Sequence, residues 1–470
     1  MIRRTSGLFI GLFLCISMLQ AQPLMVDPAD TAAMPGMTGT KAGMIATKAR
    51  MIATKARMTA TKVRMADFMS QRFGMFIHWG PVTLRGTEIG WSRNKEVPAE
   101  DYDKLYKEFN PVLFDAAAWV RTAKEAGMKY LTITAKHHDG FCLWPTAYSD
   151  YNIMNSPIRK DIVGELAREC KKQGIIFCIY FTVLDWHNPD YPIHNPHKPV
   201  IDSTANMDRF VTTMKNELNE LITRYHPYML WFDGNWESPW KHRYAVEVND
   251  FLKKTDPQLI INNRLEAGDD HEHLAGEAIG DYATPEQKIG ELNMDTPWET
   301  CMTICNQWAW KPNDDMKSLK VCIQTLVKTA SGNGNLLFNV GPMPDGRMEA
   351  RQTERLKQMG DWLKKYGESI YGTKGGPYIP NDSFATTRKG DNIYLHVFNG
   401  KTGSIVLPPL PSRKVKKAYF MNGAVLVFTQ DAKGAITVHL PDELPDTICQ
   451  PIVLELDGNA ADITLVTEPK

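Results

Sequence analysis

Acidic and basic side chains follow the apolar segments of this 470-residue chain that are predicted to be strands. The clearest case is Asp233, which ends the apolar run 228–232 and precedes Gly234. In parallel α/β folds the carboxyl ends of strands carry the chemistry, so Asp233 is interpreted as a nucleophile or an electrostatic carboxylate. A lone aspartate at this position can also simply cap the turn. The other strand ends decide between these two interpretations.

Those other ends carry imidazole, phenol, guanidinium and carboxyl groups at His78, His137, His138, Tyr180, Arg264 and Glu286, and Glu299 stands at the beginning of the seventh predicted strand. The carboxyl ends of parallel strands meet on one face of a closed sheet. One polar residue at a strand end is usually structural, but this many favour a single functional site.

A pair of carboxyl groups beside tryptophans is typical of glycoside hydrolysis. One carboxylate attacks the sugar or directs water, and the other carboxyl protonates the leaving oxygen. Asp233 fits the first role, and the nearby Arg264 is expected to keep it ionised. The acid is expected on a loop across the pocket, in drier surroundings that raise its pKa.

The histidines also raise the question of a metal. Adjacent residues such as His137 and His138 project to opposite sides of a regular strand, so both cannot easily bind one ion. The segment 269–273 is rich in Asp and His, but acidic loop residues are more often solvated. No metal and no cofactor are therefore expected. A metal-dependent hydrolase that uses the histidines is the alternative, and sensitivity to chelators would reveal it.

The segments that must position these groups alternate between strand and helix patterns. Strands are predicted at Gly74–Trp79, Tyr130–Ala135, Ile175–Phe181, Tyr228–Phe232, Gln258–Asn263, Asp281–Thr284, Trp298–Ile304 and Leu336–Val340. Helical patterns occur at Ala116–Ala126, Asp161–Lys172, Met207–Tyr225 and Ser318–Ala330. This alternation predicts a parallel sheet, and about eight units predict an imperfect (β/α)8 barrel over residues 66–372.

The character of the chain changes after Gly375-Gly376-Pro377. Short runs rich in Val, Ile, Tyr and Phe, separated by turn residues, lie at Asn392–Phe398, Gly403–Leu407, Val415–Phe420, Ala424–Thr429, Ala435–His439 and Ile452–Leu456. They predict a small antiparallel β-sandwich over residues 373–470. We expect it to pack on the barrel and support it, a carbohydrate-binding module being the alternative.

The first residues are typical of an export signal. Arg3 and Arg4 precede a short apolar core at Leu8–Leu19, and Ala21 suits cleavage, so residues 1–21 are predicted to be a signal peptide. The apolar core is too short to span a membrane. A periplasmic or secreted protein without a membrane span is expected. Residues 22–65 are predicted to be a low-complexity linker, which includes a seven-residue repeat.

The composition limits the partners. The 54 basic and 54 acidic residues balance, so no nucleic-acid partner is expected. Seven of the eight cysteines follow the signal, mostly in apolar runs, and predict neither a disulfide framework nor a zinc site. A homo-oligomer is compatible with the sequence.

Taken together, the motifs resemble the α-L-fucosidases of glycoside hydrolase family 29. The matching segments are Arg72–Gly80, Ala135–Phe141, Trp231–Gly234, Asn262–Arg264, Trp298–Glu299 and Asn333–Pro342. The resemblance implies a retaining exo-glycosidase that removes terminal α-L-fucose from glycans or glycoconjugates through a covalent intermediate on Asp233. It also implies sugar contacts by His78, Trp91, His137, His138, Tyr180 and Arg264, with Trp231 and Trp298 shaping the apolar side near the methyl group.

The resemblance leaves the acid/base open, because its position shifts between family members. Glu286 is preferred, Glu299 is the second candidate and Glu291 the third. Many relatives have Glu-Trp in the loop after the first strand, whereas this chain has Gly90 before Trp91, and only Glu88 nearby. A non-catalytic fucose-binding protein is the other alternative. The presence of Asp233 together with these glutamates favours the enzyme.

Overall fold

The computed structural model describes residues 61–274, 278–400 and 403–466. The predicted signal peptide, residues 1–21, and the linker up to residue 60 lie outside the described residues. Residues 61–70 are helical, including the last five residues of the predicted linker. Phe68 in this helix packs against Tyr130 and Tyr282, with ring centroids 5.1 and 5.5 Å apart.

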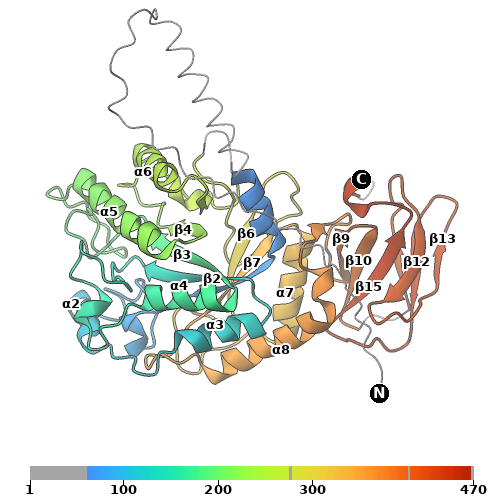
Figure 1. The fold of residues 1–470 in the computed structure, drawn as a ribbon, viewed down its shortest axis with the longest axis horizontal. Helices are drawn as coiled ribbons and strands as arrows, with labels where there is room; N and C mark the ends of the chain where they lie inside the picture. Colours follow the sequence, from blue (N-terminus) through green and yellow to red (C-terminus); the bar gives the residue numbers. More distant parts are fainter. Residues whose placement is uncertain (1–60, 275–277, 401–402, 467–470) are drawn as a thin grey trace, which may run out of the picture. The chain divides into compact units, whose positions relative to one another are not determined.

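Seven parallel strands form the central sheet (Figure 1). They are β1 (Phe73–Ile77), β2 (Tyr130–Lys136), β3 (Ile176–Thr182), β4 (Met229–Asp233), β5 (Ile260–Ile261), β6 (Glu299–Thr303) and β7 (Asn335–Val340). Hydrogen bonds join them in the order β5-β4-β3-β2-β1-β7-β6. Nearly every residue of these strands is buried, as expected for a parallel sheet with both faces covered.

A seam lies between the two edge strands β5 and β6. Here the segment 281–284, which was predicted to be a strand, forms only isolated bridges: Tyr282 pairs with Asn262, and Ala283 pairs with Trp298. Because these bridges continue the sheet from β5 to β6, the strands close into a ring whose sixth position lacks a regular ladder. The predicted imperfect barrel is confirmed.

Helices connect most of the strands. They are α2 (Ala99–Tyr102), α3 (Ala116–Glu125), α4 (Ile162–Gln173), α5 (Met207–Tyr225), α6 (His242–Thr255), α7 (Leu319–Ser331) and α8 (Ala350–Tyr366). The four predicted helical patterns correspond to α3, α4, α5 and α7, whereas α6 and α8 were not predicted. Among the described residues, no helix lies between β5 and β6, where the only helical turn is the 3-10 helix η5 (Asn263–Leu265).

Local signals in the sequence set the helix ends. The side chain of Asp161 accepts a hydrogen bond from the backbone N–H of Gly164 at 2.8 Å and so caps α4. Gly174 ends the same helix in the left-handed conformation with φ of 75°, which glycine adopts without steric cost. These caps direct the chain into β3, whose carboxyl end carries part of the site.

The C-terminal part forms two antiparallel sheets. Strands β8 (Lys374–Gly375), β9 (Phe384–Lys389), β10 (Asn392–Phe398), β12 (Val415–Phe420) and β15 (Cys449–Leu456) make one sheet in the order β12-β15-β10-β9-β8. Strands β11 (Gly403–Leu407), β13 (Phe428–Gln430) and β14 (Ile436–Leu440) make the other. The predicted sandwich is confirmed, and β9 is a strand that the sequence did not reveal.

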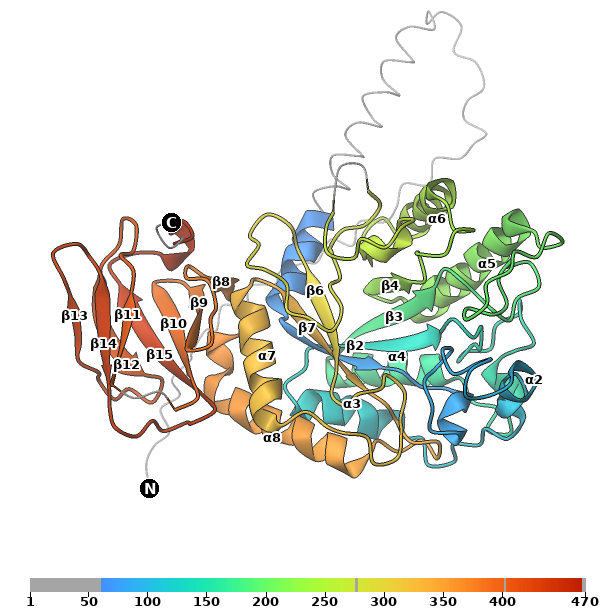
Figure 2. The same ribbon diagram turned by 180° about the vertical axis from the view of Figure 1, so that it is seen from behind.

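The sandwich packs on the barrel through α7 and α8, which lie beside its first strands (Figure 2). The indole N–H of Trp362 in α8 donates to the carbonyl oxygen of Cys449 at 3.1 Å. Gln324 in α7 donates to the carbonyl oxygen of Ile448 at 3.0 Å. In the part of the chain that the structure describes, no helix is both long and apolar enough to cross a membrane.

Candidate active site

A pocket of about 210 Å³ lies at the carboxyl ends of the barrel strands. Its wall is formed by Phe76, His78, Trp91, His137, His138, Tyr180, Trp231, Asp233, Trp236, Glu286, Cys301 and Trp308. This is small for a ligand site and suits one sugar ring better than a chain of them. The structure therefore brings together most of the residues that the sequence singled out.

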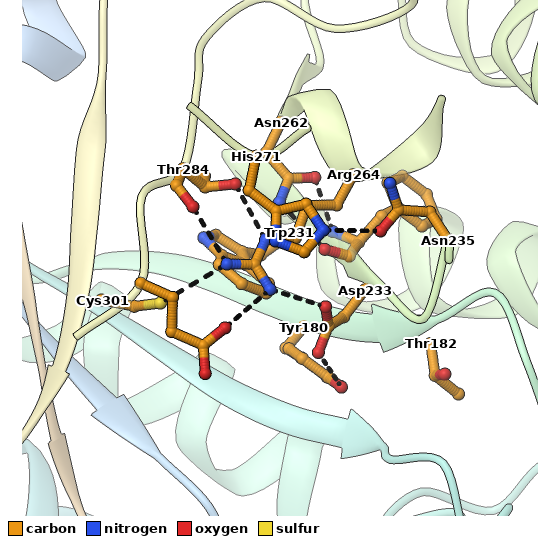
Figure 3. A network of polar contacts seen from close by, with 12 residues as sticks. Tyr180, Thr182, Trp231, Asp233, Asn235, Asn262, Arg264, His271, Thr284 and Cys301 are labelled. Atoms are coloured by element: carbon orange, nitrogen blue, oxygen red, sulfur yellow. Dashed lines mark hydrogen bonds and ion pairs between the residues drawn. The ribbon is translucent and has the colours of Figure 1, made fainter. Parts of the chain in front are cut away.

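Asp233 is the last residue of β4, and its carboxylate has partners on both oxygens (Figure 3). Oδ1 accepts from Arg264 Nη1 at 2.8 Å, and Oδ2 accepts from the hydroxyl of Tyr180 at 3.0 Å. His138 Nε2 lies 3.5 Å from Oδ2. Burial raises the pKa of Asp233, but the charge and hydrogen bond of Arg264, together with His138 and His271, outweigh it and leave this pKa below its ordinary value.

Glu286 meets Asp233 at the same guanidinium. Arg264 Nη1 also donates to Glu286 Oε2 at 2.9 Å. Since the two carboxyl oxygens lie within 2.9 Å of one nitrogen atom, they are separated by no more than twice that distance. Arg264 is itself fixed by Thr284, because its Nε donates to the Thr284 hydroxyl at 3.0 Å and its Nη2 to the Thr284 carbonyl at 2.9 Å.

The surroundings of Glu286 differ from the prediction for the acid. The side chain of Glu286 is 38% exposed and that of Asp233 is 12% exposed, so the predicted acid is the wetter of the two carboxyl groups. The reason is its place on the seam, where no described helix covers the chain between β5 and β6.

Glu299, the second candidate for the acid, does not line the pocket. It is the first residue of β6, and its buried carboxyl group accepts hydrogen bonds from the Trp231 indole at 3.1 Å and from the Tyr130 hydroxyl. Burial raises the pKa of Glu299 to about 8. The third candidate, Glu291, is exposed and also lies off the pocket wall.

Trp298 also lies away from the pocket. Its indole N–H donates to the carbonyl oxygen of Gly332 at 3.0 Å. Its ring packs so closely on Gly334 that a Cβ atom there would come within 2.4 Å of it. Trp298 therefore packs against the loop that leads into β7, and Trp231 is the tryptophan of the predicted pair that lines the pocket.

Three neutral imidazoles line one side of the pocket. Burial lowers the pKa of His78 to about 3 and that of His138 to about 4, and it also lowers the pKa of His137. His137 stacks on Tyr180 with an interplanar angle of 7°, and its buried Nδ1 has no partner in the described structure. A neutral imidazole offers one donor and one acceptor, which suits sugar hydroxyls.

The expectation that His137 and His138 project to opposite sides is wrong. The rings of His137 and His138 are 4.2 Å apart, and both line the pocket. They follow the last residue of β2, after a register shift between Thr134 and Lys136, so the alternation of a regular strand does not apply. No group of three or more His, Cys, Asp or Glu side chains placed to hold a metal ion occurs among the described residues.

Two wall tryptophans were not among the predicted site residues. Trp236 stacks on Trp91 with ring centroids 6.0 Å apart, and its position three residues after Asp233 is a signal that could have identified it. Trp308 lies 4.7 Å from His78 and comes from the long loop after β6, where no pattern in the sequence marks it.

Glu88 does not replace the carboxylate that precedes Trp91 in many relatives. Its two oxygens accept hydrogen bonds from the backbone N–H groups of Trp308 and Ala309, at 2.9 and 3.0 Å. A Cβ atom on Gly90 would lie 3.2 Å from His137 Nδ1, so the close approach of this loop to the histidines favours glycine.

Two neighbouring carboxyl groups at the carboxyl ends of barrel strands are the arrangement that barrel glycoside hydrolases use. Comparison with known proteins gives the family. The family model described as Alpha-L-fucosidase matches residues 42–368, and the chain belongs to this family of glycoside hydrolases.

Relatives and solved structures agree with this membership. The chain is 28% identical over 403 residues to an α-L-fucosidase of Branchiostoma floridae, covering 79% of this chain and 87% of that protein. α-L-fucosidase isoenzyme 1 from Paenibacillus thiaminolyticus has a similar structure, with a TM-score of 0.77, 33% identity, and coverage of 85% of this chain and all of that one. A GH29 α-L-fucosidase from Bacteroides thetaiotaomicron, trapped as a covalent intermediate with 2-fluoro-fucosyl fluoride, has a TM-score of 0.77 at 31% identity over 84% of this chain and 96% of that one.

Proposed function

We propose that this protein is a retaining exo-α-L-fucosidase that removes terminal α-L-fucose from oligosaccharides or glycoconjugates. The observation that carries the proposal is the sharing of Arg264 Nη1 by Asp233 and Glu286. In retaining glycosidases the two carboxyl groups are about 5–5.5 Å apart, whereas inverting enzymes need about 6.5–9.5 Å to admit a water. The two oxygens that share the nitrogen are closer together than the inverting range, which supports a retaining mechanism.

The first step would use both carboxyl groups. The ionised Asp233 attacks the anomeric carbon and forms a glycosyl ester, while the bond from that carbon to the leaving oxygen breaks. Glu286 gives its proton to that oxygen. In the second step a water attacks the anomeric carbon, its proton returns to Glu286, and Asp233 is released as a carboxylate.

The pocket explains why a terminal sugar is preferred. Its small volume accommodates one ring, and indoles and neutral imidazoles provide apolar faces and single hydrogen bonds. Glu286 is the more exposed carboxyl group, so it lies where the leaving group would exit.

Hydrolysis of an aryl α-L-fucoside by wild type, Asp233→Ala and Glu286→Ala tests these roles. Each variant should lose roughly a thousandfold or more in kcat on a poorly activated substrate. Azide should restore turnover of an activated substrate, giving β-fucosyl azide with Asp233→Ala and α-fucosyl azide with Glu286→Ala.

Glu299→Gln is the matched control, because it removes a carboxyl group that lies outside the pocket. It should retain turnover within about tenfold of wild type. Normal turnover by Asp233→Ala would show that Asp233 is not the nucleophile. If the Glu299 variant loses turnover and the Glu286 variant keeps it, Glu299 is the general acid/base. A wild type that binds fucose without hydrolysing fucosides would instead make the protein a fucose-binding protein.

The domain organisation and the export of the protein are also proposals. We propose a signal peptide at residues 1–21, a linker at 22–65, a barrel at 66–372 and a sandwich at 373–470, with the mature protein in the periplasm or outside the cell. N-terminal sequencing of the processed protein tests the cleavage site. A mature chain that still begins at Met1 would contradict it.

A further inference from the structure

A chain of hydrogen bonds begins at Nδ1 of the His78 ring. His78 Nδ1 lies 2.7 Å from Asn339 Oδ1. Asn339 Nδ2 donates to the carbonyl oxygen of Trp308 at 2.8 Å. Glu88 in turn binds the backbone N–H groups of Trp308 and Ala309. His78 and Asn339 are 3% and 1% exposed, so water does not compete with these bonds.

The chemistry of these groups fixes the direction of each bond. A carbonyl oxygen can only accept, so the Asn339 amide must turn its NH₂ group toward Trp308. Its oxygen then faces His78 and can only accept, so the proton of the His78 ring is on Nδ1. Burial lowers the pKa of His78 to about 3, so the ring is neutral and Nε2 carries a lone pair.

The neighbouring His138 carries its ring proton on the other nitrogen. His138 Nε2 faces the carboxylate of Asp233 at 3.5 Å, and an ionised carboxylate oxygen can only accept, so the ring proton is on Nε2. His138 Nδ1 then accepts from the hydroxyl of Thr182 at 2.8 Å, and this hydroxyl accepts from the backbone N–H of Leu184 at 3.2 Å. Two histidines on one wall are thus held as different tautomers by the groups behind them.

We propose that Asn339 is a positioning residue that keeps His78 Nε2 as a hydrogen-bond acceptor, so that this point of the wall selects a sugar hydroxyl that donates. Among the described residues, none hydrogen-bonds to His78 Nε2, and His78 lines the pocket. Glu88 supports the arrangement by fixing the backbone of Trp308, whose carbonyl orients Asn339. The identity of the ligand as a sugar rests on the proposed function.

The tautomers can be read directly by NMR of the full-length protein labelled with ¹⁵N-histidine. His78→Gln and His138→Gln identify the two rings among the twelve histidines. At neutral pH, His78 should be protonated at Nδ1 only and His138 at Nε2 only. Finding His78 protonated at Nε2, or at both nitrogens, would overturn the proposal.

Asn339→Leu tests the positioning role. It should remove the preference of His78 for Nδ1–H and raise the fraction of Nε2–H. Asn335→Leu is the control on the same strand, because its amide donates to the carbonyl oxygen of Phe68 at 2.9 Å and faces no pocket residue. Should Asn339→Leu fail to fold, Glu88→Gln replaces it, since an amide cannot accept from two N–H groups as well as a carboxylate does. An unchanged His78 spectrum in the folded variant would contradict the role.

Substrate analogues give a second measurement. In aryl α-L-fucosides with one hydroxyl replaced by fluorine, the fluorine can accept a hydrogen bond but cannot donate one. Each loss in kcat/KM is measured relative to the unmodified aryl fucoside. For one of these analogues, the loss in wild type should exceed the loss in Asn339→Leu by on the order of tenfold. Equal losses in both proteins for every analogue would overturn the selection of a donor. Absence of any turnover by wild type would overturn the proposed function, whereas the NMR result does not depend on turnover.

Discussion

Arg264 links the two carboxyl groups of the site to the aromatic floor of the pocket. It donates to Asp233 and Glu286, and its guanidinium lies over the Trp231 ring, 4.7 Å from the centroid. A buried carboxylate would ordinarily tend to bind a proton, and the adjacent positive charge prevents this at Asp233. The charge state of Asp233 is therefore a property of the pair.

Replacing Arg264 by methionine should shift the pH dependence of the reaction. In the proposed mechanism Asp233 must be ionised to attack, so its low pKa should keep wild type active toward acid pH. Without the arginine, less positive charge offsets the effect of burial, so the pKa of Asp233 rises. The acid limb of the kcat/KM profile should then move to higher pH, besides a general loss of activity.

Arg64→Met is the matched control, because Arg64 also lies over an aromatic ring, that of Tyr228 at 4.1 Å. Tyr228 is not part of the pocket wall. The acid limb should stay in place in this variant. An acid limb that stays in place in Arg264→Met would show that another group keeps Asp233 ionised.

Glu299 should make stability depend on pH. Its folded pKa of about 8 is above the ordinary value of 4.5. The folded protein therefore binds a proton between these values that the unfolded chain releases, and the stability contributed below pH 4.5 is lost as pH rises toward 8. Glutamine at position 299 does not titrate. The free energy of unfolding of Glu299→Gln relative to wild type, measured by urea denaturation, should rise from pH 5 to pH 8. A pH-independent difference would contradict the assignment.

The site residues that the sequence located on the pocket wall are mostly those that end a strand. Asp233 and Tyr180 lie at the carboxyl ends of β4 and β3, where spacing and fold class together determine the location. Glu299 begins its strand, so it lies at the opposite end of β6 from the pocket, where its carboxyl group accepts from Tyr130 and Trp231. Trp308 could not be predicted, because a loop position follows from tertiary contacts such as those with Glu88.

At the scale of secondary-structure elements, a buried cluster of charges connects β2, the loop after β3 and α5. Lys136 Nζ lies 2.7 Å from Asp185 Oδ2 and 2.9 Å from Glu217 Oε2, and all three side chains are at most 5% exposed. Lys136 directly precedes the two adjacent histidines of the pocket. The cluster therefore ties the backbone of the site to the helical layer.

Lys136→Met should destabilise the protein by about 3–5 kcal/mol, because it leaves two buried carboxylates without a positive charge beside them. Adding Glu217→Gln should recover part of this loss, since one of the unpaired charges is removed. The free energies of unfolding in urea of the single and double variants test both statements. A double variant no more stable than Lys136→Met would show that Glu217 is not the unpaired charge.

The sequence predicted the elements with clear periodicity or clear ends. α4 is an example, with its Asp161 cap and Gly174 stop. α8 was missed because its buried residues, such as Leu356 and Met359, are few among charged ones. The interrupted ladder at residues 281–284 was read as a full strand, since an apolar segment alone does not reveal how many hydrogen bonds its neighbours make.

At the scale of the whole molecule, the barrel and the sandwich share buried surface. Cys449 of β15 and Phe398 of β10 belong to the same hydrophobic cluster as the barrel core. The sandwich also has a core of its own, which includes Ile393, Val438 and Leu454. This arrangement favours a sandwich that stabilises the catalytic barrel.

Trp362→Ala should therefore weaken the molecule as a unit. It removes a large side chain that is 5% exposed and its hydrogen bond to the Cys449 carbonyl, so a loss of about 3 kcal/mol is expected. Calorimetry should show wild type unfolding in one transition at a higher temperature than the variant. Trp362→Phe, which keeps most of the packing, should be affected less. A variant that melts like wild type would show that this contact contributes little.

The seam between β5 and β6 has a consequence for how such proteins diverge. A regular ladder fixes the number of residues in a strand, because inserting or removing one residue reverses which side chains face inward. Between Thr284 and Trp298 the chain makes no regular ladder, and its isolated bridge to the sheet pairs Glu286 with Cys301 of β6. A change of length between this bridge and Trp298 would leave the ladders of the seven strands in register. The number of residues between the proposed proton donor and β6 would change while the barrel keeps its pairing.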